Sequence, residues 1–82
     1  MKLRFVSFKN GRERYLFKVD NLSSVALRET DLSGLILEIT SIDGRVDEIE
    51  VANHEVANNI IYGIICAINS EDRVYIIDGV GQ

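Results

Sequence analysis

The side chains of this chain that could take part in catalysis are few and far apart in the sequence. The only histidine is His54 and the only cysteine is Cys66. A catalytic nucleophile needs a base beside it and a third group that orients the base. His54 is expected at the exposed start of a helix, and Cys66 lies in an apolar run that is typical of a buried, unreactive thiol. We therefore predict that the chain is not an enzyme and has no catalytic residues.

The densest group of carboxylates comprises Asp43, Asp47, Glu48 and Glu50. Their oxygens could bind a hard cation, but their spacing does not match a calcium-binding loop. A solvated face of a strand explains these residues more simply. Gly79-Val80-Gly81 is short and leads into no helix, so it does not form a phosphate-binding loop. The sequence therefore predicts no bound metal and no cofactor.

Length and composition indicate one small globular domain that spans residues 1–82. The chain has 82 residues, of which 46% are hydrophobic, and a formal net charge of −4. A net negative charge argues against a general nucleic-acid binder. The longest apolar run, residues 60–68, is about half the length that spans a bilayer, and the charges of Lys2 and Arg4 interrupt any signal peptide. We expect a cytoplasmic protein without a membrane segment, and the small size suggests a bacterial or viral origin.

Turn dipeptides predict two β-hairpins, over residues 2–19 and 35–51. Asn10-Gly11 and Asp43-Gly44 each separate two apolar stretches, which is the strongest short-range signal for a hairpin. In both hairpins we expect a three-residue loop that ends on the glycine, because glycine readily adopts the left-handed conformation that such a loop needs.

These loops determine which residues lie opposite each other. In the first hairpin, a loop of residues 9–11 pairs Leu3 with Phe17 and Phe5 with Tyr15, whereas a two-residue Asn10-Gly11 loop would scatter the aromatic residues. In the second hairpin, a loop of residues 42–44 pairs the following residues: Leu35 with Val51, Leu37 with Ile49, and Glu38 with Glu48. The last pair places like charges opposite each other, which is destabilising.

The remaining elements are a short strand, a helix and a final strand. Residues 24–29 are expected to form the strand. Asn53 is a good N-cap for a helix that ends at Asn69 or Ser70, and the β-branched residues in 73–78 favour a strand. The predicted fold class is α+β: an antiparallel sheet of about six strands with one helix packed on it, in the order β-β-β-β-β-α-β.

The second half of the predicted helix has more apolar residues than one buried face requires. Tyr62, Ile65 and Cys66 lie off the face that points to the core. A helix that is apolar on all sides is buried on all sides. Either the final strand or another subunit should therefore cover this back of the helix.

Charge is distributed unevenly along the chain. The first 18 residues contain six basic residues and one acidic residue, a net charge of +5, and the other 64 contain three basic and twelve acidic residues, a net charge of −9. With the expected loops, the outward face of the first hairpin combines basic and apolar residues: Lys2, Arg4, Arg12, Arg14, Lys18, Val6, Phe8 and Leu16. The same face of the second hairpin carries Glu38, Glu48 and Glu50.

Three interpretations follow from this pattern. The two hairpins could lie in one sheet, so that their charges cancel. The chain could instead be a protein-interaction module, forming a homo-oligomer or binding a protein partner, for which the expected interface residues are Val6, Phe8, Leu16, Tyr62 and Ile65. The alternative is a nucleic-acid-binding domain that uses Arg4, Arg12, Arg14, Lys18 and Phe8. We expect the interaction module.

Overall fold

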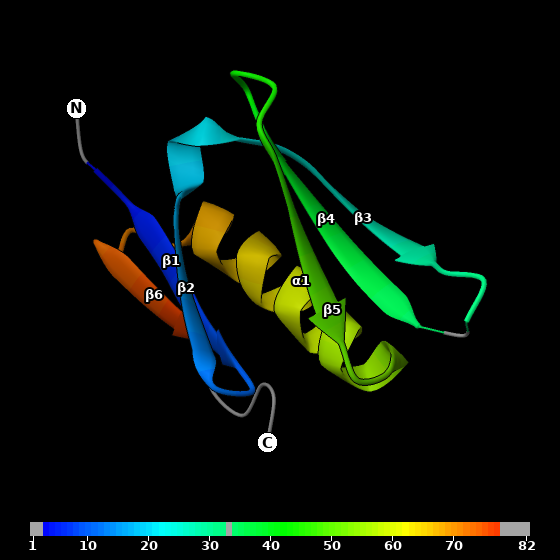
Figure 1. Cartoon of the computed structure of the whole chain (residues 1–82). Coiled ribbons are helices and arrows are strands. Elements are labelled where there is room, and N and C mark those ends of the chain that lie inside the picture. The colour runs from blue at the N-terminus through cyan, green and yellow to red at the C-terminus, as the bar shows by residue number, and fades with distance from the viewer. Residues whose placement is uncertain (1–2, 33, 78–82) are drawn as a thin grey trace.

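The computed structural model describes residues 3–32 and 34–77, which form six strands, one α-helix and a short 3-10 helix, η1 (Figure 1). The elements are β1 (Phe5–Asn10), β2 (Glu13–Lys18), η1 (Val19–Asn21), β3 (Leu22–Glu29), β4 (Leu35–Ser41), β5 (Val46–Val51), α1 (His54–Asn69) and β6 (Val74–Ile77). The α+β class and the element order are as predicted. Lys2 and the predicted features at residues 78–81 lie outside the described residues.

The six strands divide into two three-stranded sheets, whereas the prediction was a single antiparallel sheet, and the two hairpins lie in different sheets. Sheet A has the order β2-β1-β6 and sheet B has the order β3-β4-β5. Figure 1 shows the strands of the two sheets on different sides, with α1 between them in this view. In sheet A, β6 runs parallel to β1, with Val6 opposite Tyr75. Parallel neighbours need a long crossover connection, and the segment that contains α1 leads into β6 at the edge of sheet A.

The register predicted for the first hairpin is wrong. Asn10 pairs with Glu13, so the loop consists of Gly11 and Arg12 alone. Gly11 does adopt a left-handed conformation, with φ of 64°. It is, however, the first residue of a two-residue loop, where hairpin turns favour positive φ, and not the last of a three-residue loop. The shift reverses the faces of β1, and Val6 and Phe8 point inward.

The register predicted for the second hairpin is confirmed. Leu35 lies opposite Val51, Leu37 opposite Ile49 and Glu38 opposite Glu48. Residues 42–44 form the loop, and Gly44 has a φ of 91°. The backbone N–H of Gly44 donates to the carbonyl of Ser41 over 2.9 Å, which closes the turn.

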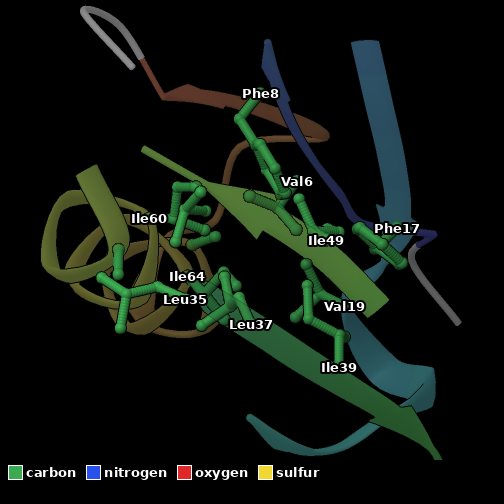
Figure 2. Packing of buried hydrophobic residues seen from close by; sticks show 13 residues of the cluster. Val6, Phe8, Phe17, Val19, Leu35, Leu37, Ile39, Ile49, Ile60 and Ile64 are labelled. Carbon is green, nitrogen blue, oxygen red and sulfur yellow. The ribbon is translucent and has the colours of Figure 1, made fainter. Parts of the chain in front are cut away.

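One hydrophobic core joins the inner faces of both sheets to α1 (Figure 2). Its largest fully buried side chains are Phe8, Leu37, Ile39, Ile49, Ile60 and Val6. Phe8 stacks on Tyr15 and Phe17, with ring centroids 5.3 and 6.0 Å away. The actual register places these three rings on one face. It also buries Val6 and Phe8 completely, which the predicted register would have turned outward.

The ends of α1 are held by polar side chains. Asn53 is the N-cap, as predicted, and its side-chain oxygen accepts a hydrogen bond of 2.9 Å from the Val56 N–H. At the other end, Arg4 donates hydrogen bonds of 2.9 Å to the carbonyls of Ile68 and Ser70. The last carbonyls of a helix have no partner within the helix, so Arg4 provides one and fixes α1 to the start of β1.

Candidate interaction surface

The outward face of sheet A combines exposed apolar residues with cations. Side chains of neighbouring strands form rows across it: Lys18, Phe5 and Val74 in one row, and Leu16, Ser7 and Ile76 in the next. Three aliphatic side chains in these rows are exposed: Leu16 to 60%, Ile76 to 56% and Val74 to 46%. We call these six residues, together with Lys9 and Arg14 in the adjoining row, the sheet A surface.

The central residue of this surface, Ser7 of β1, is covered although it faces outward. Ser7 is 5% exposed, and its side-chain oxygen accepts a hydrogen bond of 3.1 Å from Arg14. Leu16 and Ile76 flank Ser7 on the neighbouring strands. Arg14 is thus held across the sheet beside these apolar residues, and Lys9 lies opposite Arg14. The resulting surface is apolar in its middle and cationic along one side.

The outward face of sheet B is anionic and is less apolar. Its rows pair Ile36 with Glu50, Glu38 with Glu48, and Thr40 with Val46. We call these six residues, with Arg28 of β3, the sheet B surface. Val46 is 48% exposed. The backbone carbonyl of Glu50 accepts a hydrogen bond of 2.7 Å from the Asn10 side chain, which ties this edge of sheet B to the first hairpin.

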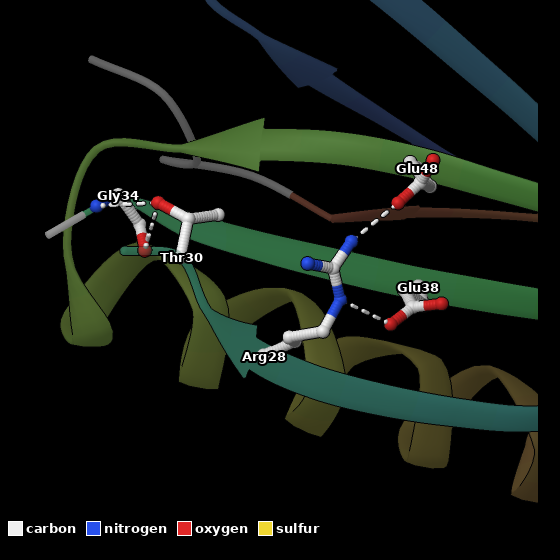
Figure 3. Close-up of polar contacts among 5 residues, drawn as sticks. All are labelled: Arg28, Thr30, Gly34, Glu38 and Glu48. Carbon is white, nitrogen blue, oxygen red and sulfur yellow. Dashed lines mark hydrogen bonds and ion pairs between the residues drawn. The ribbon is translucent and has the colours of Figure 1, made fainter. Parts of the chain in front are cut away.

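Arg28 offsets the repulsion between Glu38 and Glu48. Its guanidinium lies 2.8 Å from one carboxylate and 2.5 Å from the other, as Figure 3 shows. Hydrogen bonding to Glu38 and then to Glu48, with the charges of both residues, raises the pKa of Arg28. A cation on the neighbouring strand therefore stabilises a like-charged pair that would otherwise be unfavourable.

Two of the five predicted interface residues cannot form a surface. Val6 and Phe8 are completely buried, because the register of the first hairpin turns them inward. Leu16, from the same prediction, is exposed on the sheet A surface. Tyr62 and Ile65 are exposed to 69% and 50% on α1.

The final strand covers only part of the back of α1. Ile77 packs against Gly63, since a Cβ added to this glycine would lie 2.6 Å from Ile77 Cγ1. Cys66 is half-buried and lies beside Tyr75 of β6. The hydrogen bond to Cys66, then the charge of Cys66 and the burial of Tyr75, raise the pKa of Tyr75. Tyr62 and Ile65 remain outside this contact. β6 therefore covers Cys66 but not Tyr62 and Ile65 among the apolar residues on the back of α1.

The predicted nucleic-acid-binding residues do not form one site. Phe8 is in the core, where no base can stack on it. Arg4 is bound to the end of α1 and to Asp20, whose carboxylate lies 3.0 Å from its guanidinium. Arg12 lies in the hairpin loop. Of these five residues, only Arg14 and Lys18 share a surface, where Leu16 lies between them on β2 and the half-buried Phe5 lies opposite Lys18.

A polar cleft of about 460 Å³ lies between the turn end of the first hairpin and β5. It is lined by Asn10, Arg12, Glu13, Tyr15, Glu48 and Glu50. The Tyr15 hydroxyl donates a hydrogen bond of 2.7 Å to Glu13. This bond, together with burial and the charges of Glu13 and Asp47, raises the pKa of Tyr15. Tyr15 therefore stays protonated at neutral pH and is unsuited to act as a base.

His54 and Cys66 also lie apart from any candidate site. His54 is exposed at the first turn of α1, as expected, with Nε2 3.4 Å from a carboxylate oxygen of Glu29. Cys66 lies about three turns further along α1, beside Tyr75 of β6. Across residues 3–32 and 34–77, no three His, Cys, Asp or Glu residues are grouped so that they could hold a metal ion.

Val74 and Ile76 are surface residues that the sequence analysis did not assign to an interface. The β-branched run in 73–78 predicted their strand, but nothing local showed which face would be outward. The signal that identifies them is the pairing of β6 with β1, which places Ile76 beside Ser7. Such a pairing between distant segments cannot be deduced from the alternation within one strand.

No helix in the described part of the chain has the length and apolarity needed to cross a bilayer. No known protein family, curated protein or solved structure matches the chain.

Proposed function

We propose that this chain is a non-enzymatic protein-interaction module that binds its partner through the sheet A surface. The observation that supports this proposal is the placement of three exposed aliphatic residues, Leu16, Val74 and Ile76, in two adjacent rows on one face of sheet A. Contiguous apolar groups with a polar rim are characteristic of binding surfaces.

The free energy available from covering this surface is substantial. Complete burial of one Val, Leu or Ile side chain contributes about 1.5–3 kcal/mol relative to full exposure, and these three side chains are about half exposed. Arg14 adds a side chain of a type that is enriched in interfaces and that favours carboxylates. A partner surface with apolar residues and carboxylates would complement both properties.

The neighbours of the cations favour a protein over a nucleic acid. Single-stranded nucleic acids bind to cationic grooves in which aromatic rings stack on the bases. On the sheet A surface the most exposed apolar residues are aliphatic. The only aromatic ring on it, that of Phe5, is half-buried, and the ring of Phe8 lies in the core. The net charge of −4 further opposes approach to a polyanion.

Site-specific photo-crosslinking in the cells that make the protein tests this proposal. A benzophenone side chain replaces Leu16, and a matched control chain carries it at Asn58, which is exposed on α1. Irradiation should yield a protein adduct from position 16 and not from position 58. The double substitution Arg14→Ala/Lys18→Ala should strongly reduce that adduct, because both cations flank Leu16 on β2.

The identity of the adduct decides between the classes of partner. A protein joined at position 16 supports an interaction module. An adduct that nuclease removes would overturn the proposal in favour of nucleic-acid binding, and a lipid adduct would favour a membrane surface. Equal adducts from positions 16 and 58 would show that the sheet A surface has no special affinity for proteins.

A further inference from the structure

We infer that the partner of the sheet A surface is the sheet B surface of a second copy of this chain. This inference rests on the proposed function and specifies the occupant. The two surfaces are complementary in charge: Lys9, Arg14 and Lys18 give the first a charge of +3. Glu38, Glu48 and Glu50 together with Arg28 give the second a charge of −2.

Glu50 is the carboxylate that would respond most to a partner. Glu38 and Glu48 already share Arg28. The Glu50 side chain is exposed, and the ion pairs of the described residues do not include it. It lies opposite Ile36, so that an anion adjoins an apolar side chain. The sheet A surface has the corresponding arrangement, with Lys18 opposite Phe5.

The shapes of the two surfaces are also compatible. Each is the outward face of a three-stranded sheet. Strand spacing and rise give a footprint of about 14 Å by 20 Å for three strands of six residues. Two such faces can pack about 10 Å apart with their strands roughly aligned. A footprint of this size, about 280 Å² per copy, is well below the roughly 800 Å² per partner of a stable interface, so we expect weak, reversible and concentration-dependent association.

The two surfaces cannot contact each other within one chain, because the opposite faces of both sheets share one core. In Figure 3, which looks onto the sheet B surface, α1 lies behind the strands. Contact between copies would therefore be head-to-tail, with each copy using a different surface toward each neighbour. Such a contact forms a ring or an open row of copies and not a closed symmetric dimer.

Sedimentation velocity of the purified chain over a range of concentrations tests this arrangement with one variant for each surface. Leu16→Ser/Ile76→Ser removes apolar contact from the sheet A surface, and Val46→Lys/Glu50→Lys makes the sheet B surface cationic without changing the residues around Arg28. The control Tyr62→Ser/Ile65→Ser removes the exposed apolar residues of α1. Circular dichroism and melting temperature show that each variant is folded.

The wild-type chain should increase in mass with concentration, and its affinity should fall about tenfold or more when salt is raised from low concentration to roughly 0.5 M. Each surface variant should stay monomeric, while the α1 control should associate like the wild type. A mixture of the two surface variants should form a one-to-one dimer that grows no further, because each variant retains one intact surface and the two intact surfaces are complementary.

Three results would overturn the inference: a wild-type chain that is monomeric at every concentration, a loss of association in the α1 control, or surface variants that do not associate when mixed. The proposed function is tested separately by the photo-crosslinks. If position 16 traps a different protein while the purified chain stays monomeric, the proposed interaction module is supported, and the inference that its partner is a second copy is wrong. If position 16 traps no protein and association depends on α1, both are wrong.

Discussion

Gly63 of α1 lies against Ile77 of β6 with no space for a side chain at position 63: an added Cβ would be 2.6 Å from Ile77 Cγ1 and 3.0 Å from Ile77 Cγ2. Gly63 is in the interior of a 16-residue helix, where glycine is less favourable than alanine by about 1 kcal/mol. The close packing of β6 on the helix, which needs a glycine at this position, offsets this loss of helix stability.

The substitution Gly63→Ala should therefore destabilise the fold, in contrast to most Gly→Ala changes in helices. Overpacking typically costs about 1–3 kcal/mol, which exceeds the gain in helix propensity, so the free energy of unfolding should fall by about 1 kcal/mol. In an Ile77→Ala background the same substitution should be stabilising by up to about 1 kcal/mol. Urea denaturation of the four proteins measures both effects. The same sign in both backgrounds would show that Ile77 does not restrict position 63.

The contrast between the two hairpins shows what local sequence can predict. Both contain an Asx-Gly dipeptide, and both glycines have positive φ. The second hairpin has Gly44 at the end of a three-residue loop, whereas the first has Gly11 at the start of a two-residue loop. Local pairing rules favoured a three-residue loop in both. Packing of the Phe8, Tyr15 and Phe17 rings against the rest of the core, a tertiary effect, favours the other register in the first.

The helix and the acidic face were predictable for a different reason. The Asn53 cap and the apolar spacing of α1 are local signals. The register of the second hairpin likewise follows from its own turn and strand residues. By contrast, the position of β6 beside β1 depends on contacts between residues more than 60 positions apart. The sheet A surface combines β2 and β6, so half of it could be expected from the first hairpin and half could not.

Arg4 should contribute to stability and not to nucleic-acid binding. Its side chain donates hydrogen bonds to two carbonyls at the end of α1 and forms an ion pair with Asp20. Arg4→Met keeps much of the aliphatic stem and removes these donors. We expect a loss of about 1–2 kcal/mol in the free energy of unfolding and faster amide exchange near Ser70. A variant of unchanged stability would mean that water replaces the guanidinium without cost.

The hydroxyl of Tyr15 should contribute to stability only while it is protonated. Because its pKa is raised in the folded chain, first by the hydrogen bond to Glu13, folding favours the neutral phenol. The stabilisation is fully present below the ordinary pKa of about 10 and is lost as pH rises through the higher pKa of the folded state.

Comparison of the wild type with Tyr15→Phe between neutral and alkaline pH measures this contribution. The wild type should be more stable at neutral pH by at most about 0.5 kcal/mol, since solvent screens this contact, and the difference should vanish well above pH 10. Glu13→Gln serves as the control, because it keeps a hydrogen-bond acceptor and removes the charge. A difference that grows with pH would contradict the assigned direction of the shift.

Arg28 should stabilise sheet B by an effect that salt weakens. Arg28→Ala leaves Glu38 directly opposite Glu48 without a shared cation. Its melting temperature should be lower than that of the wild type at low ionic strength, and the gap should narrow as salt screens the two carboxylates. Adding Glu48→Gln to Arg28→Ala should restore most of the loss. If the gap is the same at all salt concentrations, lost packing of the arginine stem is the cause instead.

Truncation to alanine should have very different effects on stability at three positions that were predicted to share one interface: Val6, Phe8 and Leu16. Phe8→Ala removes a fully buried ring and should cost about 3–5 kcal/mol, which could unfold a domain of this size. Val6→Ala is a milder deletion at an equally buried position, so a loss of stability can still be measured there. Leu16→Ala should change the free energy of unfolding by less than about 0.5 kcal/mol, because its side chain is exposed. Equilibrium denaturation in urea, with constant slope as the check on two-state behaviour, compares the three. A large loss in Leu16→Ala alone would place Leu16 in the core and remove the sheet A surface as a candidate interface.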